Sequence, residues 1–229
     1  MEFTLQTSPL SDGSNEMYAI LQGEYDSIIE VYGNAFKNFG HPILFRLMNE
    51  MNGDWCPYSS YNTSKDTIIY REVYRYIYEK FRQMGVKNLI WIWNPNEGSF
   101  PNFKWNHMLM YYPGDEYVDV IGLTAYNTGT YYASVGESWQ EFTTLYDGIY
   151  SEYQERFSQP MMITEFSCAK VGGDKRTWTK NMFRKIKEYD RIKVAIWWSC
   201  TDFDNTTGEI SRDYRIDDVL DIFKEELKK

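Results

Sequence analysis

The sequence predicts an α/β fold of the TIM, or (β/α)8, barrel type, and three observations support this prediction. Apolar runs of strand length alternate with helical patterns along the chain, and the connections between them are short. Two of the runs, Pro42 to Glu50 and Pro160 to Glu165, end in a glutamate. Barrel enzymes build their active site from residues at the carboxyl ends of such strands. A doubly wound open sheet is the alternative, but the sequence lacks the Gly-rich phosphate loop that would favour it.

The first part of the chain predicts two strands and two helices. Met1 to Gln6 alternates apolar and polar residues and is predicted to be a strand, followed by a polar loop rich in Ser, Asp and Gly. Residues 25–39 have the apolar spacing of a helix, which stops at Gly40. After the first strand that ends in glutamate, Asp66 is predicted to cap a long helix that runs to Met84.

The second part continues the alternation and closes with a helix. The predicted elements are strands at 88–93 and 117–123, a helix at 139–157, the strand at 160–165, a helix at 174–189, a strand at 192–198 and a helix at 216–227. This gives about six strands, whereas a barrel needs eight. Either strands near the N-terminus escape the pattern, or the first one or two βα units are missing. We expect one catalytic-type barrel domain over residues 1–229.

Charge and composition narrow the class of partner. A formal net charge of −9 argues against nucleic acid or an anionic membrane as a partner. A neutral polymer or a small molecule is compatible with it. Aromatic residues make up 18% of the chain, and their rings suit the apolar faces of sugars as well as they suit a protein core. No apolar run approaches the roughly 18 residues of a membrane span, and the N-terminus carries no signal segment. The residues alone leave the localisation unknown.

The cysteines and acidic residues do not predict a metal site. The three cysteines form no CxxC spacing and the two histidines lie far apart, so we expect no zinc site and predict free thiols. Residues 202–209 share some features of a calcium loop. They lack Gly at the sixth position, and Asp213 stands where the ligand Glu of the twelfth position would be. We therefore predict a turn after the last strand.

The residues around the two glutamates resemble a known enzyme family. FRLMNEMNGDW resembles the acid/base strand of the retaining barrel glycosidases of clan A, the fourth strand, and MMITEF resembles their nucleophile strand, the seventh. With YPGDEYVDVIGLTAYN and VAIWW, the chain is most similar to glycoside hydrolase family 26 from about Gly40 to Asp204. That family contains β-mannanases, some mixed-linkage β-glucanases and β-1,3-xylanases. The resemblance implies that the strands found are the third to eighth of the barrel.

The resemblance assigns roles to the two carboxylates. It implies that Glu50 is the general acid/base and Glu165 the nucleophile of a retaining mechanism. Retaining enzymes hold these two carboxyl groups about 5–5.5 Å apart. Glu50 then has to carry a proton while Glu165 is ionised. Tyr126 is expected to donate its phenol hydrogen bond to Glu165, which would keep that carboxylate ionised. No cofactor is implied, because two carboxylates need only water.

Further side chains are expected to bind the substrate. Asn49 stands where many members of the family have His, and its amide can bind a sugar hydroxyl or orient Glu50. Trp198 is expected to form a sugar platform, with Trp55 and Trp93 as further candidates. Trp197 is adjacent to Trp198 in a strand, so only one of the two can face the site. Each of these residues has an alternative role in core packing, and Tyr126 is equally open to both roles.

We therefore expect a retaining endo-β-glycanase that hydrolyses a plant-type β-linked polysaccharide, with β-1,4-mannan favoured. One alternative is a mixed-linkage β-1,3-1,4-glucanase of the lichenase type, and another is a non-catalytic carbohydrate-binding barrel remnant. A third is an α/β protein whose strand-end glutamates only form ion pairs, such as Glu50 with Arg46. The resemblance also implies an extracellular location. An incomplete barrel exposes strand edges, which predicts self-association.

Overall fold

The computed structural model describes residues 1–8 and 15–228. Within these residues, six parallel strands follow one another in the sheet in sequence order. They are β1 (Glu2–Leu5), β2 (Ile43–Leu47), β3 (Leu89–Trp93), β4 (Val120–Asn127), β5 (Met161–Cys168) and β6 (Ile192–Trp197). Strands β7 (Thr201–Phe203) and β8 (Ile210–Asp213) form a separate antiparallel pair. The predicted α/β class and incomplete barrel are confirmed, because the described parallel strands are two short of eight.

Helices connect the parallel strands, and the residues group into two compact units. The helices are α1 (Glu16–Leu21), α2 (Asp26–Phe39), α3 (Ile68–Gln83), α4 (Phe142–Arg156), α5 (Lys175–Ile186) and α6 (Leu220–Glu226). Short 3-10 helices are η1 (Lys104–Asn106), η2 (Met108–Tyr111), η3 (Asp115–Tyr117) and η4 (Ala133–Val135). Unit 1 comprises residues 1–122 and unit 2 residues 123–229, so the boundary falls inside β4. Each unit has its own aromatic core.

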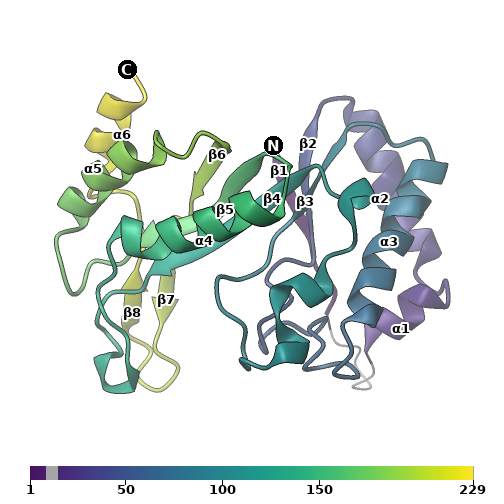
Figure 1. Cartoon of the computed structure of the whole chain (residues 1–229), viewed down its shortest axis with the longest axis horizontal. Coiled ribbons are helices and arrows are strands. Elements are labelled where there is room, and N and C mark those ends of the chain that lie inside the picture. Colours follow the sequence, from purple (N-terminus) through teal and green to yellow (C-terminus); the bar gives the residue numbers. More distant parts are fainter. Residues whose placement is uncertain (9–14, 229) are drawn as a thin grey trace. The chain divides into compact units, whose positions relative to one another are not determined.

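The core of unit 1 centres on Phe45 of β2. Its side chain is completely buried, and its ring meets Phe36 of α2 at 5.4 Å, Phe81 of α3 at 5.9 Å and Trp91 of β3 at 4.8 Å between centroids. These contacts bring α2 and α3 onto the same side of β2 and β3, where Figure 1 shows them lying next to each other. The apolar residues that recur at helical spacing in residues 26–39 are therefore the ones that cover the strands.

The core of unit 2 is a second aromatic cluster. Phe142 of α4 meets Trp178 of α5 at 5.6 Å and Phe166 of β5 at 6.2 Å. Trp197 of β6 meets Phe166 at 5.3 Å and Phe223 of α6 at 5.3 Å. The last helix is thus attached to the sheet through the ring of Trp197. Edge-on ring contacts of this kind contribute about 0.5–1.5 kcal/mol each beyond the area that they bury.

The ends of several predicted elements carry the expected signals. Gly40 follows α2 with φ of 69°, a left-handed conformation that favours glycine. Asp174 caps α5, because its side chain accepts hydrogen bonds from the backbone N–H groups of Arg176 and Thr177. At α3 the N-cap residue is Thr67 and not the predicted Asp66, but the Asp66 carboxylate accepts from the N–H of Ile68 at 2.9 Å. The chain stops and starts these helices where its sequence indicates.

Other predicted boundaries are wrong. Strand β2 ends at Leu47 and not at Glu50, because φ is positive at Met48 (48°) and at Glu50 (54°) and the backbone has left the extended region. Strand β5 does not stop at Glu165 but continues to Cys168, with Phe166 still paired to β6. Helix α1 and the β7–β8 pair were not predicted, and α6 begins four residues later than expected. The loop predicted after Gln6 falls largely on residues 9–14, which lie outside the described residues.

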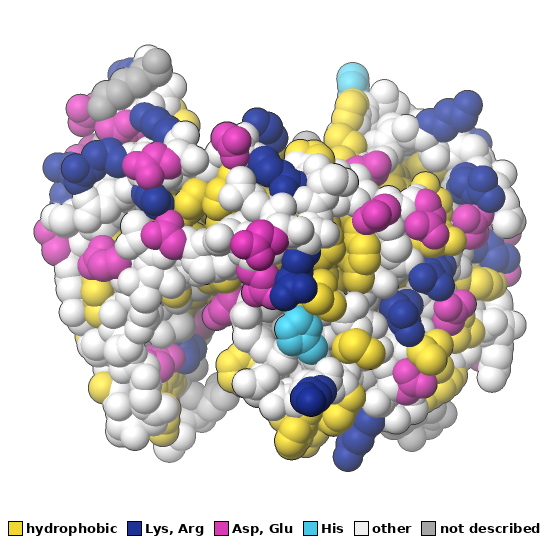
Figure 2. Space-filling view, viewed as in Figure 1, with side chains coloured by type: hydrophobic (Ala, Val, Ile, Leu, Met, Phe, Trp, Pro, Cys, Tyr) yellow, Lys and Arg dark blue, Asp and Glu magenta, His cyan; other side chains and the backbone are white. Residues whose placement is uncertain are grey.

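The surface carries charges of both signs. Figure 2 shows acidic and basic side chains interspersed over the helices of unit 1. On α3 some of them pair along the helix, as Arg75 does with Glu72 at 3.2 Å and Arg82 with Glu79 at 2.7 Å. Such exposed pairs contribute little to stability, about 0.3–0.5 kcal/mol each. Among the described residues, no helix combines the length and the apolar character needed to cross a bilayer.

We predict that Phe45→Ala lowers the free energy of unfolding by about 3–5 kcal/mol, because it removes a buried ring and leaves a cavity. Phe39→Ala is the matched control in the same unit, since that ring is 44% exposed. Its expected cost is below about 1 kcal/mol. Urea unfolding of both variants measures the difference. Equal losses would contradict the assignment of Phe45 to the core of unit 1.

Candidate functional site

The predicted site residues are divided between the two units. Unit 1 holds Glu50 together with Asn49, Trp55 and Trp93, and unit 2 holds Glu165 together with Tyr126 and Trp198. The two carboxylates therefore have separate local surroundings, each built by the strands and loops of its own unit.

Glu50 lies in a tight bend directly after β2. Its N–H donates to the carbonyl of Asn94 at 2.7 Å, and its own carbonyl accepts from the N–H of Gly53 at 2.9 Å. The side chain is half-buried, and the indole N–H of Trp55 donates to its Oε2 at 3.4 Å. Positive φ at a residue other than glycine costs about 1–3 kcal/mol. The bend that aims Glu50 is thus a strained feature, maintained by hydrogen bonds to the segment after β3.

Asn49 is buried and bound on both its side chain and its backbone. Its Oδ1 accepts a hydrogen bond from Nε2 of Gln6 at 2.7 Å, and its carbonyl accepts from the hydroxyl of Tyr58 at 2.6 Å. Burial raises the pKa of Tyr58, so that phenol stays neutral and remains a donor. The amide next to Glu50 is therefore held in one place by residues from two separate segments, the end of β1 and the loop after β2.

Asparagines after β2 and β3 form a network that the sequence analysis did not identify. Asn52 accepts from the N–H of Asn96 at 2.8 Å and donates to the carbonyls of Asn96 and Gly98, each at 3.0 Å. Asn106 donates to the carbonyl of Asn52 at 2.9 Å. The sequence signal that could have indicated this network is the high number of Asn residues near two predicted strand ends. These bonds join the loop that carries Glu50 to the loop after β3.

Arg46 belongs to the same part of unit 1. Its guanidinium pairs with Glu2 at 3.1 Å and donates to the side-chain oxygen of Asn94 at 3.1 Å. The sequence also allows Arg46 to pair with Glu50. In the structure it connects β1, β2 and the segment that follows β3.

The two tryptophans of unit 1 differ in exposure. Trp55 is 52% exposed, and its ring lies 5.6 Å from that of Phe100, so it offers an accessible aromatic surface beside Glu50. Trp93 is completely buried, with its ring against Tyr112 at 5.0 Å. Its burial leaves no face for a sugar ring to stack on, so Trp93 is not retained in the proposed substrate site.

In unit 2, Glu165 receives the hydrogen bond that the sequence analysis expected. The hydroxyl of Tyr126 on β4 donates to its Oε2 at 2.6 Å, and both side chains are half-buried. A charge-assisted bond of this length is among the stronger hydrogen bonds in proteins. Tyr126 therefore contacts the carboxylate directly, whereas the catalytic role of either residue stays a prediction.

The backbones that carry this pair are cross-linked. The hydroxyls of Thr124 and Thr164 lie 2.9 Å apart, and Thr164 also donates to the carbonyl of Leu123 at 3.1 Å. The Tyr146 hydroxyl of α4 accepts from the N–H of Ala125 at 3.0 Å and lies 2.9 Å from the Ala125 carbonyl. Buried hydroxyls thus fix β4 to β5 and to α4 directly beside Tyr126 and Glu165.

Trp198 and Trp197 face different surroundings, as expected for adjacent residues at a strand end. Trp198 is 43% exposed, and its N–H donates to the carbonyl of Phe166 at 2.9 Å. Trp197 packs in the core of unit 2, and its indole N–H donates to the carbonyl of Tyr214 at 2.9 Å. Trp198 keeps the accessible ring that a sugar platform needs, and that function stays a prediction.

A model of glycosyl hydrolase family 26 matches residues 4–189, a range that contains both glutamates. The chain belongs to glycosyl hydrolase family 26. The resemblance found at the two glutamate motifs is confirmed.

Known proteins that are similar to this chain match different shares of it. Endoglucanase H of Acetivibrio thermocellus is 33% identical over 184 residues, 78% of this chain and 20% of that protein. A mannan endo-1,4-beta-mannosidase of Bacillus subtilis is 38% identical over 100 residues, 42% of this chain and 26% of that protein. A solved Cellulomonas fimi endo-beta-1,4-mannanase has a TM-score of 0.62 at 21% identity, over 99% of this chain and 52% of that one. At that identity the likeness shows the fold alone, and the chain spans about half of the solved protein.

The three cysteines are free thiols, as predicted, and they differ in burial. Cys56, near the carbonyl of Asn49, and Cys168, which accepts from the Asn127 side chain at 3.2 Å, are both buried. Burial raises the pKa of each of these two thiols to about 12. Cys200, after β6, is exposed.

We predict that one thiol of the folded protein reacts rapidly with a thiol reagent at pH 8, and that it is Cys200. A thiol with a pKa of about 12 is ionised in only about one molecule in ten thousand at that pH, and the thiolate is the reactive form. Cys200→Ser should abolish the rapid phase, whereas Cys168→Ser should leave it. Rapid labelling of two or three thiols in the native protein would contradict the described packing around Cys56 and Cys168.

Proposed function

We propose that this chain is a retaining endo-β-glycanase acting on a plant-type β-linked polysaccharide, with β-1,4-mannan as the favoured substrate. Family membership and the two glutamate motifs support the proposal. The observation that carries it is the 2.6 Å hydrogen bond from Tyr126 to Glu165, because a nucleophilic carboxylate needs a donor that favours its ionised form.

In the proposed mechanism, Glu50 is the acid/base and Glu165 the nucleophile. The Glu165 carboxylate attacks the anomeric carbon, and the bond from that carbon to the leaving oxygen breaks as Glu50 donates its proton to that oxygen. Glu50, now ionised, takes a proton from water, and the oxygen of that water displaces Glu165 from the anomeric carbon. Both residues return to their starting state, and the configuration at the anomeric carbon is retained.

The surroundings of the proposed acid/base fit this assignment. Glu50 is half-buried, and the indole N–H of Trp55 donates to its Oε2 at 3.4 Å, so its carboxyl group has a defined neighbour. Its indole partner, Trp55, is an exposed ring that can also lie against a sugar. In unit 2, Trp198 offers the second exposed ring. Asn49, held by Gln6, keeps the bend before Glu50 in place and is proposed to contact a sugar hydroxyl.

A second substrate is supported by a specific observation. The relative named as an endoglucanase matches this chain over 184 residues, whereas the Bacillus subtilis mannosidase matches over 100. Mannan is nevertheless favoured, because several relatives with that named activity match the chain. Mixed-linkage β-glucan is therefore the alternative substrate, and a carbohydrate-binding barrel without activity is the alternative of a different class. In this proposal β1 to β6 correspond to the third to eighth strands of the family barrel.

We predict release of reducing sugar from mannan, and none from Glu165→Gln. Glu50→Gln should lower the rate by about 10²–10⁴-fold, the usual contribution of general acid–base catalysis. Glu116→Gln, an exposed glutamate of unit 1, is the matched control and should keep full activity. Mixed-linkage β-glucan is assayed in parallel, and NMR of the first product should show the anomeric configuration of the substrate.

Full activity in Glu165→Gln would overturn the proposed mechanism. Release from glucan alone, lost in the same variant, would keep the mechanism and change the substrate. Sugar binding without release in the folded wild-type chain would favour the non-catalytic alternative.

We also propose that the chain self-associates. Strands β1 and β6 are the first and last in the order of the described sheet, and terminal strands present backbone groups to which another chain can pair. On α2, Ile28 and Val31 are apolar and 49% and 68% exposed. We expect light scattering at micromolar concentration to give a mass above that of one chain, and Val31→Lys to reduce it. A monomer under these conditions would contradict this expectation.

A further inference from the structure

Tyr214, which follows β8, packs against the residue that donates to Glu165. Its ring lies 5.4 Å from the ring of Tyr126, at an angle of 46° between the planes, and only 4% of Tyr214 is exposed. Tyr126 in turn donates to Glu165 at 2.6 Å. A buried ring from the end of β8 thus supports the donor on β4, which contacts the carboxylate on β5.

The backbone of Tyr214 is held at both of its polar groups. Its carbonyl accepts from the hydroxyl of Ser167 at 3.1 Å and from the indole N–H of Trp197 at 2.9 Å. Its N–H donates to the carbonyl of Cys200 at 2.9 Å. The segment that carries Tyr214 is therefore attached to β5, to β6 and to the chain after β6, so its ring has a defined position.

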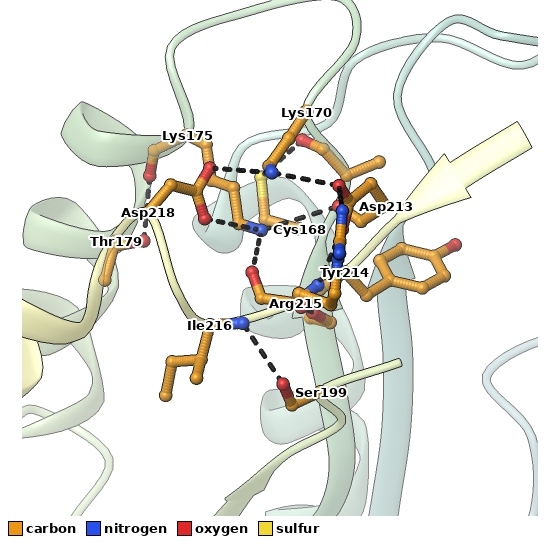
Figure 3. A network of polar contacts seen from close by, with 12 residues as sticks. Cys168, Lys170, Lys175, Thr179, Ser199, Asp213, Tyr214, Arg215, Ile216 and Asp218 are labelled. Atoms are coloured by element: carbon orange, nitrogen blue, oxygen red, sulfur yellow. Dashed lines mark hydrogen bonds and ion pairs between the residues drawn. The ribbon is translucent and has the colours of Figure 1, made fainter. Parts of the chain in front are cut away.

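The residues on either side of Tyr214 are held by two lysines (Figure 3). The ammonium of Lys175, a buried residue at the start of α5, donates to the carbonyl of Arg215 at 2.6 Å and to that of Asp213 at 3.5 Å. It also pairs with Asp218 at 3.4 Å. Lys170 pairs with the carboxylate of Asp213 at 2.9 Å. These contacts fix the backbone immediately before and after Tyr214.

The ring of Tyr214 restricts the space beside Tyr126 sterically and carries no charge. Burial is the main cause that raises the pKa of Tyr214, so its phenol is neutral over the working pH range of a hydrolase. An ionised phenolate there would compete with Glu165 for donors. A neutral, immobile ring instead leaves Tyr126 with fewer accessible rotamers.

We propose that Tyr214 is a positioning residue, which holds the ring of Tyr126 in the orientation that delivers its hydrogen bond to Glu165. This inference rests on the proposed function, in which Glu165 is the nucleophile. Small misplacements of a group near the reacting atoms cost rate more than affinity, since the alignment matters most in the transition state. Tyr214 should therefore influence kcat through Tyr126 and leave KM nearly unchanged.

A double-mutant cycle tests this on the polysaccharide that the wild-type chain hydrolyses. Tyr126→Phe should lower kcat by about 10–100-fold, the value of one hydrogen bond to a charged group. Tyr214→Leu should lower kcat by about 10-fold with KM within about 2-fold, and Tyr214→Phe, which keeps the ring, should restore most of it. In the Tyr126→Phe background, Tyr214→Leu should cost less than about 2-fold more, because the bond that it positions is already gone.

Tyr153→Leu is the matched control. This tyrosine is equally buried, lies on α4 of the same unit and packs against Phe157. Its loss should lower stability and leave kcat of the folded protein unchanged. If the double variant loses kcat by the product of the two single-variant factors, the two residues act independently and the inference is overturned. A loss of kcat in Tyr153→Leu as large as that in Tyr214→Leu would also overturn it. If Tyr214→Leu does not fold, Ser167→Ala removes one of the two donors to the Tyr214 carbonyl, and the same pattern is expected at smaller size.

An NMR measurement reports the same pair without activity. In protein labelled with ¹³C at Cζ of tyrosine, the Tyr126 resonance is assigned by its loss in Tyr126→Phe. It should shift in Tyr214→Leu in the same direction as in Glu165→Gln, and stay in place in Tyr153→Leu. An unmoved resonance in Tyr214→Leu would overturn the inference. Activity in Glu165→Gln would instead overturn the proposed function, so the two failures are distinguishable.

Discussion

The hydrogen bond from Tyr126 to Glu165 is the contact on which the organisation of unit 2 depends. A half-buried carboxylate is stable as an anion only if donors replace the water that it has lost. The donor comes from the neighbouring strand, so β4 and β5 must keep one register and one spacing. Buried polar contacts hold the strands in this arrangement. They are the hydrogen bond between Thr124 and Thr164 and the bond from the Ala125 N–H to the Tyr146 hydroxyl of α4.

In unit 1, the position of Glu50 is fixed by backbone hydrogen bonds and not by a neighbouring strand. No regular strand carries Glu50, because the backbone turns through positive φ at Met48 and again at Glu50 itself. Such a bend is unfavourable in isolation and persists only where its surroundings leave no alternative. Here the Glu50 N–H is bound by Asn94, and the next loop is bound through Asn52. Asparagines after β2 and β3 thereby fix the direction of the Glu50 carboxylate, which lies in the bend that follows β2.

Much of the fold was predictable, because local signals and tertiary packing agree. The helix that stops at Gly40 and the strand around Phe45 follow from apolar spacing and a glycine that tolerates a left-handed conformation. The bend at Met48 was not predictable, since nothing in a Met or Glu side chain favours positive φ. The expected Tyr126 contact is present, because both residues come from neighbouring strands. The contact between Tyr214 and Tyr126 was not predicted. Tyr214 follows the short β7–β8 hairpin, and no local sequence pattern specifies where that hairpin packs.

The buried ammonium of Lys175 helps to determine the position of the segment that carries Tyr214. Burial lowers the pKa of this lysine and the charge of Asp218 opposes that shift, so the ammonium is retained at a cost in desolvation. An apolar side chain would avoid that cost but would leave the carbonyls of Asp213 and Arg215 without this donor. Hydrophobic packing tolerates small shifts of a segment. The two carbonyls, in contrast, can both accept a hydrogen bond from the Lys175 ammonium only when the segment lies in one position. The ion network therefore selects one placement of the Tyr214 backbone among several that would bury the same apolar area.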